Sequence, residues 1–75
     1  MSYTDDVAND LAAQALAEAE RSGDARIVDQ IGEILGASPQ TLQESYLTFV
    51  RVRRAEARAR ELLARHAETA VKTPD

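Results

Sequence analysis

The stretch VDQIGEILGASPQTLQESYL, residues 28–47, decides the fold of this chain. Its first part is apolar at spacings of three and four residues, as along one side of a helix. Gly36 is expected to end that helix. Ser38 and Pro39 then favour a new one, because serine caps helix N-termini and proline suits the first helical position. The stretch therefore predicts two helices joined by a short turn.

A first helix is expected before this stretch, over about residues 4–22. Ser2 or Thr4 can cap it, since a side-chain oxygen there accepts a free backbone N–H. Gly23 is expected to end it, because glycine readily adopts the left-handed backbone conformation. Its expected apolar face comprises Val7, Leu11, Ala12, Ala15 and Ala19, with Leu16 at the edge.

The second helix is expected over residues 24–35, capped by Asp24. Gly32 in its middle costs roughly 1 kcal/mol relative to alanine. We interpret Gly32 as leaving room for a neighbouring helix to cross nearby. The expected buried face is Ile27, Val28, Ile31, Ile34 and Leu35.

The third helix is expected over residues 39–71, where neither glycine nor proline interrupts it after its first residue. A continuous helix of that size would be about 50 Å long, whereas a compact domain of this size is about 30 Å across. The helix therefore either kinks or breaks near residues 48–52, or its two halves pack on different partners. Residues 72–75 are expected to be disordered. The apolar side chains are Leu42, Tyr46 and Phe49 on one side, and Val52, Ala55, Ala59, Leu62, Leu63, His66 and Ala70 about 100° away.

The fold class predicted from these patterns is all-α, a small domain of three helices, or four if the last one breaks. Thirteen acidic residues against nine basic ones make the chain anionic. Residues 1–37 hold eight acids against two arginines, and residues 38–75 hold seven bases against five acids. There is no cysteine and no apolar run long enough for a membrane. We expect a cytoplasmic protein with no membrane contact.

No set of residues indicates catalysis, and we predict a protein that is not an enzyme and takes no cofactor. His66 is the one histidine, and no second ligand is spaced to join it in a metal site. The carboxylate pairs Asp6–Asp10 and Asp29–Glu33 are expected to be solvated acids. Function is therefore sought in binding surfaces.

The residues of IGEILGASPQTL resemble the helix-turn-helix of bacterial DNA-binding proteins. The resemblance covers about residues 28–47. In that family a small residue at Gly32 admits the second helix, a glycine at Gly36 makes the turn, and an aliphatic residue at Leu42 buries the recognition helix. It implies a DNA-reading surface at Gln40, Thr41, Gln43, Glu44 and Thr48.

The charges around this motif disfavour nucleic acid. Asp24, Asp29 and Glu33 stand where a DNA-binding protein would place lysine or arginine against phosphate. No basic residue precedes Arg51 in the third helix. Arg51, Arg54, Arg58 and Arg65 form one stripe, which could pair with glutamates of its own helix or with the acidic first helix, grip an acidic partner protein, or bind phosphate.

The two functional hypotheses belong to different classes. The first is a small non-enzymatic regulator that binds another protein or a second copy of itself. The other protein could be a transcription factor, which is what bacterial antiactivators bind. The alternative is a dimeric helix-turn-helix DNA-binding repressor. The charge favours the first, with the partner surface predicted at Tyr46, Phe49, Val50, Arg51, Val52, Arg54 and Arg58. For the four apolar residues of this set the alternative is that they only complete the core with Ile27, Ile31 and Leu35.

Overall fold

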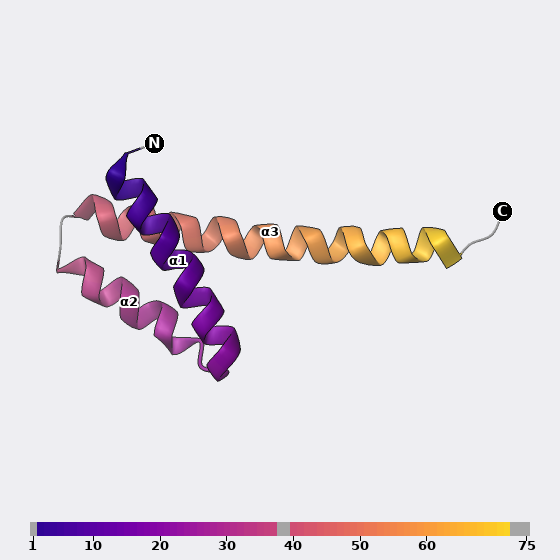
Figure 1. The fold of residues 1–75 in the computed structure, drawn as a ribbon, viewed down its shortest axis with the longest axis horizontal. Coiled ribbons are helices and arrows are strands. Elements are labelled where there is room, and N and C mark those ends of the chain that lie inside the picture. Colours follow the sequence, from indigo (N-terminus) through magenta and orange to yellow (C-terminus); the bar gives the residue numbers. More distant parts are fainter. Residues whose placement is uncertain (1, 38–39, 73–75) are drawn as a thin grey trace.

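The computed structural model describes residues 2–37 and 40–72, which form three helices and no strand. α1 spans Tyr3–Ser22, α2 spans Arg26–Gly36 and α3 spans Gln40–Lys72. The predicted all-α class is confirmed. α1 crosses the first half of α3, α2 runs beside that half in the opposite direction, and the second half of α3 projects away from both (Figure 1).

α1 begins and ends with the caps that its sequence predicts. Ser2 Oγ accepts the backbone N–H of Asp5 at 3.1 Å. Asp5 and Asp6 lie in the first turn, where the helix dipole favours negative charge. At the other end Gly23 has φ 76°, and its N–H donates to the Ala19 carbonyl at 2.9 Å. Gly23 is thus the left-handed residue that ends α1.

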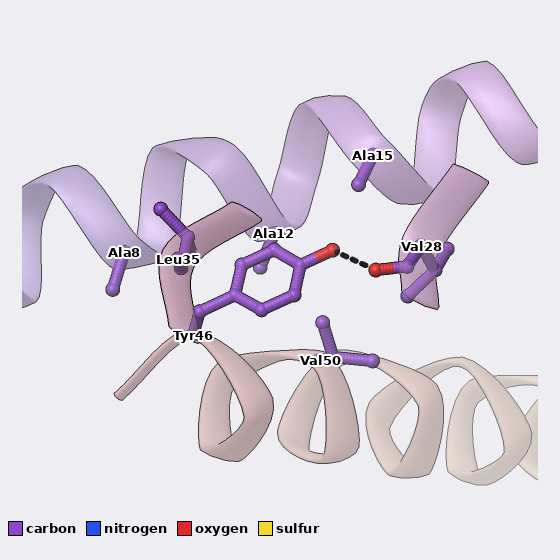
Figure 2. Packing of buried hydrophobic residues seen from close by; sticks show 7 residues of the cluster. All are labelled: Ala8, Ala12, Ala15, Val28, Leu35, Tyr46 and Val50. Carbon is purple, nitrogen blue, oxygen red and sulfur yellow. Dashed lines mark hydrogen bonds between the residues drawn. The ribbon is translucent and has the colours of Figure 1, made fainter. Parts of the chain in front are cut away.

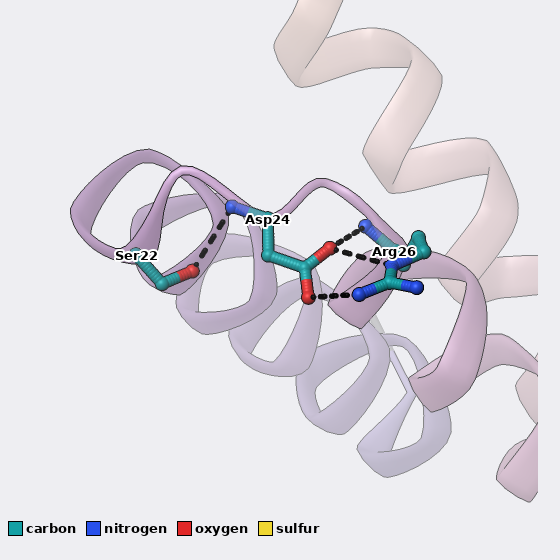
Figure 3. A network of polar contacts seen from close by, with 3 residues as sticks. All are labelled: Ser22, Asp24 and Arg26. Carbon is teal, nitrogen blue, oxygen red and sulfur yellow. Dashed lines mark hydrogen bonds and ion pairs between the residues drawn. The ribbon is translucent and has the colours of Figure 1, made fainter.

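The connection between α1 and α2 is held by a small polar network (Figure 3). Ser22 Oγ accepts the Asp24 N–H at 3.2 Å, and Asp24 Oδ1 accepts the backbone N–H of Arg26 at 3.0 Å. The Arg26 guanidinium also donates to the Asp24 carboxylate at 3.0 and 3.2 Å. α2 begins at Arg26 with Ala25 at the N-cap position, two residues later than predicted, and Asp24 still satisfies its first N–H.

The end of α2 differs in detail from the expectation. Gly36 is its last residue, but the cap is Ala37 in the right-handed conformation, with φ −85°. Among the residues that the structure describes, only Gly23 has a positive φ. The chain therefore leaves α2 without the left-handed glycine typical of helix ends. The predicted capping role of residues 38–39 lies outside the described part of the chain.

α3 is one unbroken helix through residues 48–52. The molecule measures 57 × 30 × 13 Å, and its radius of gyration of 16.2 Å exceeds the roughly 11 Å of a compact domain of this size. The expected compactness is therefore wrong. The helix stays straight and its far half projects into solvent. The predicted disorder of the tail falls mostly on residues 73–75, which lie outside the described residues, while Lys72 still belongs to α3.

The core forms around Tyr46, whose side chain is fully enclosed between the three helices (Figure 2). Its hydroxyl donates to the Val28 carbonyl at 2.8 Å, which satisfies a polar group that would be costly to bury alone. Alanines on α1 face the ring and allow α1 to approach closely. The buried residues are Ala8, Ala12, Ala15, Val28, Leu35, Tyr46 and Val50.

Two predicted faces are corrected by this packing. Ala8 is completely buried although the sequence pattern did not include it, and Ile34 is 68% exposed although it was expected inside. The reason is the rotation of α2, which turns Val28, Gly32 and Leu35 towards the core. Ile34 therefore lies on the outer side of α2.

Gly32 is buried where α3 packs on α2, as expected, but the close approach comes from side chains. A Cβ at this position would lie 3.6 Å from both Leu47 Cδ2 and Tyr46 Cε2. These are ordinary van der Waals distances, so the crossing does not itself require glycine.

Candidate protein-binding surface

Polar contacts fix the first half of α3 against α1. Ser45 Oγ donates to Asp5 Oδ1 at 3.0 Å. One turn past the core, Arg53 donates from Nε and Nη2 to Asn9 Oδ1 at 3.1 and 2.8 Å. Both pairs join residues about 40 positions apart in the chain and were not foreseen from the sequence. The Arg53–Asn9 contact is the last described bond between α3 and α1.

These contacts divide the molecule into two parts. We call residues 2–37 and 40–53 the head, and residues 54–72 the arm. Every side chain from residue 54 to residue 69 is exposed. As far as residue 69, the arm is thus a solvated helix that the other described residues do not cover (Figure 1).

The predicted partner surface mixed core and surface residues, and the structure separates them. Tyr46 and Val50 are 0% and 3% exposed, so their assignment to a partner surface is wrong. Phe49 is half-buried and packs against the core. Val52, by contrast, is 54% exposed. Most of the apolar residues predicted for the partner surface therefore lie on the core face of α3.

A second apolar face runs along the other side of α3. Leu62 and Leu63 are 60% and 68% exposed, so two large aliphatic side chains of the arm face water. This face is the second apolar cluster predicted from the sequence. The cluster also included Ala70, whose side chain lies outside the described residues. We call the described part the distal face, which comprises Val52, Ala55, Ala59, Leu62, Leu63 and His66, all exposed.

The arginine stripe lies beside the distal face. Arg51, Arg54, Arg58 and Arg65 are all exposed. The glutamate pairing expected along the arm is seen at Glu56–Arg60, at 2.9 Å, which lies outside the stripe. At about 100° per residue, the stripe and the distal face are neighbours on the helix surface. An apolar strip edged by positive charge results.

The alternative DNA-reading residues lie on the head. Thr41, Glu44 and Thr48 are exposed on α3. Gln43 is partly buried and its Nε2 donates to the Gly32 carbonyl at 2.9 Å, so its amide is engaged within the fold. The side chain of Gln40 lies outside the described residues. The structure thus presents three of the five predicted side chains to solvent.

A pocket of about 300 Å³ opens between α1 and α2. It escaped the sequence analysis because Ile27 and Ile31 were assigned to the core, whereas both are only partly buried. The exposure of Ile34 on the same side of α2 could not be read from periodicity alone. The residues lining the pocket are Leu11, Gln14, Ala15, Glu18, Ile27 and Ile31.

The charged groups of the head with shifted pKa values are ion-pair partners. The Arg21 guanidinium, bound to Glu18, lowers the pKa of that carboxyl, and the pKa of Arg21 is raised in turn. Hydrogen bonds from Arg26 lower the pKa of Asp24. Each pair is local, solvent-exposed and typical of a surface contact. None of them resembles a catalytic acid or base.

Among the described residues, no three histidine or acidic side chains gather as a metal site would require. No helix in the same part of the chain has the length and apolar character needed to cross a bilayer. Comparison with known protein families, curated proteins and solved structures finds no match to this chain. Its function must therefore be argued from its own surfaces.

Proposed function

We propose that the protein is a small non-enzymatic regulator that acts by binding another protein through the distal face of its arm. The observation that carries this proposal is the exposure of Leu62 and Leu63 on an arm that no other described part of the chain covers. Apolar faces of this kind mark sites of interaction. In this proposal the protein works in the bacterial cytoplasm, and the partner is a transcription regulator bound in the manner of an antiactivator.

The stability of the arm supports the same proposal. Most of the stability of a protein helix comes from packing an amphipathic face. The arm has such a face, with its large aliphatic side chains Leu62 and Leu63 on one side, but in a single chain that face is solvated. A partner helix laid along the distal face would bury it, as helices do in hydrophobic grooves.

The arginine stripe indicates the charge of that partner. Positive side chains at the edge of an apolar strip favour acidic residues on the partner helix, and they accelerate encounter more than they raise affinity. We therefore expect a partner segment that is amphipathic, helical and acidic along its flank.

DNA binding is the weaker candidate. The exposed residues of the predicted reading face include Glu44, and α2 beside it exposes Asp29 and Glu33, all of which repel phosphate. Gln43, the residue best suited to read a base edge, is engaged with Gly32. A gel shift that compares the wild-type protein with Thr48→Ala tests this alternative without disturbing the core. We expect neither protein to form a sequence-specific complex with DNA.

Photo-crosslinking in cells tests the proposal. A photoreactive amino acid at position 62 should crosslink the partner, whereas the same residue at position 64, on the opposite side of the arm, should not. Mass spectrometry of the adduct identifies the partner and its contacting helix.

Two results would count against the proposal. One is a crosslink at position 64 as strong as that at position 62, which would indicate indiscriminate contact. The other is an adduct at position 62 that contains only this chain.

A further inference from the structure

The pocket between α1 and α2 has the apolar lining of a helix-docking site. Four of its six lining residues are apolar, and Ile27 and Ile31 remain partly open to solvent. Ile34, which is 68% exposed, continues the same side of α2 at helical spacing. The head therefore presents an aliphatic strip that its own chain leaves uncovered.

Acidic side chains of α1 lie beside this strip. Glu18 lines the pocket, where its carboxylate is paired with Arg21, and Gln14, which also lines it, donates to Asp10 Oδ2 at 2.8 Å. Over residues 2–37 eight acidic residues stand against two arginines, a net charge of −6. A helix that enters this pocket should carry apolar side chains flanked by positive ones.

The arm has both properties. Its distal face supplies Leu62 and Leu63, and the arginine stripe runs along its edge. Residues 54–72 contain four arginines, one lysine and three glutamates, a net charge of +2. The arm is thus complementary to the pocket in apolar character and opposite to the head in charge.

The two surfaces cannot meet within one chain. α3 is continuous from Gln40 to Lys72 and contains no glycine or proline in that span. The arm consequently points away from its own head (Figure 1). Folding it back would require breaking the helix, so the pocket and the distal face can meet only between two copies of the chain.

We propose that the arm of one copy docks its distal face on the α1–α2 pocket of a second copy, and that the second arm does the same in return. Such a reciprocal pair is closed and uses both surfaces of both chains. It sets each positive arm against a negative head, whereas two arms paired in parallel would bring together two heads, each with a net charge of −5. The pair does not depend on the proposed function, although another protein bound to the distal face would compete with it.

A complementation experiment in the analytical ultracentrifuge tests the reciprocal pair. Leu62→Asp places a charge on the distal face of the arm, and Ile31→Asp places one in the pocket. For each variant alone, the protein concentration required for association should rise by about tenfold or more. An equimolar mixture should recover part of the association. In the mixed pair, the intact arm of the Ile31→Asp chain meets the intact pocket of the Leu62→Asp chain.

Matched variants separate docking from folding. Ala64→Asp places the same charge on the opposite side of the arm and should associate like wild type. On the head, Glu18→Lys at the exposed pocket rim should weaken association, whereas Glu20→Lys, with the same charge change on α1 but outside the pocket lining, should have a smaller effect. Circular dichroism confirms that each variant keeps its helix content.

Three outcomes would overturn the reciprocal pair. Wild-type protein that sediments as a monomer at every concentration excludes self-association. Sensitivity to Leu62→Asp alone, with Ile31→Asp and Glu18→Lys both unaffected, shows that arms pair with arms. A mixture no stronger than its components shows that arm and pocket do not meet. The crosslinking result with another protein is read independently of all three.

Discussion

The head and the arm share one helix, yet different interactions hold them. In the head, α3 is fixed by the enclosed ring of Tyr46 and by side-chain bonds to α1 and α2. In the arm, the same helix has solvated side chains on every side from residue 54 to residue 69. Continuity of the backbone therefore does not imply a common source of stability. The head is stabilised by tertiary packing, whereas the described side chains of the arm make no such packing contacts within the chain.

The sharpest way to break this comparison is to truncate one large side chain in each part. Tyr46→Ala should cost about 3–5 kcal/mol, because it empties the centre of the core. That approaches the entire net stability of a domain this small. Leu63→Ala, on the exposed arm, should change the free energy of unfolding by no more than about 0.5 kcal/mol. Urea denaturation followed at 222 nm measures both.

Equal losses for these two variants would contradict the division into head and arm. They would mean that the arm packs on the head of its own chain. A concentration-dependent loss for Leu63→Ala alone would instead indicate contact with a second copy.

A smaller change isolates the hydrogen bond of the core. Tyr46→Phe keeps the ring but leaves the Val28 carbonyl without its donor, which should cost about 1–2 kcal/mol. Burial raises the pKa of Tyr46, outweighing the opposite effect of nearby Arg54. The stabilisation from the protonated hydroxyl is therefore complete below the unfolded pKa of about 10 and is lost as pH rises through the folded pKa.

Urea midpoints between about pH 8 and pH 11 provide the measurement. The wild-type midpoint should fall at the alkaline end by more than that of Tyr46→Phe. Parallel curves for the two proteins would show that the Tyr46 hydroxyl does not control the alkaline loss.

The smallest expected effects come from two glycines of the head. Gly32→Ala should stabilise the protein by up to about 1 kcal/mol, because alanine favours helix and its Cβ would make ordinary contacts 3.6 Å from α3 side chains. Gly23→Ala should cost about 1 kcal/mol, since φ 76° strains any residue with a Cβ. Thermal unfolding distinguishes them by opposite shifts in Tm. A loss for Gly32→Ala would show that the space beside Leu47 and Tyr46 does not accommodate the added methyl group.

Much of the head could be predicted from local patterns. Gly23 was identified as a helix end, and Ser2 as one of two candidate caps with Thr4, because cap chemistry depends on a few neighbouring residues. The rotation of α2 about its axis was harder to predict from the sequence. Ile34 and Val28 look equally apolar in sequence, and only the position of α1 and α3 decides that Val28 is buried and Ile34 exposed.

The candidate surfaces show the same limit. The change of apolar face along α3 was visible at residues 48–52, but periodicity alone allowed either a kink or two separate partners. The structure has a continuous helix, so the second face does not pack on its own head and is exposed. The pocket between α1 and α2 depends on how two helices diverge, and no short sequence pattern encodes that.

The unbroken helix between Arg53 and Leu62 also fixes the orientation of Leu62 around the helix axis relative to the head. A one-residue insertion there would swing the leucines about 100° around the axis, while seven residues would return them nearly to their original bearing and carry them about 10 Å outward. The number of residues between the head and Leu62 thus determines the direction in which Leu62 and Leu63 face relative to the head.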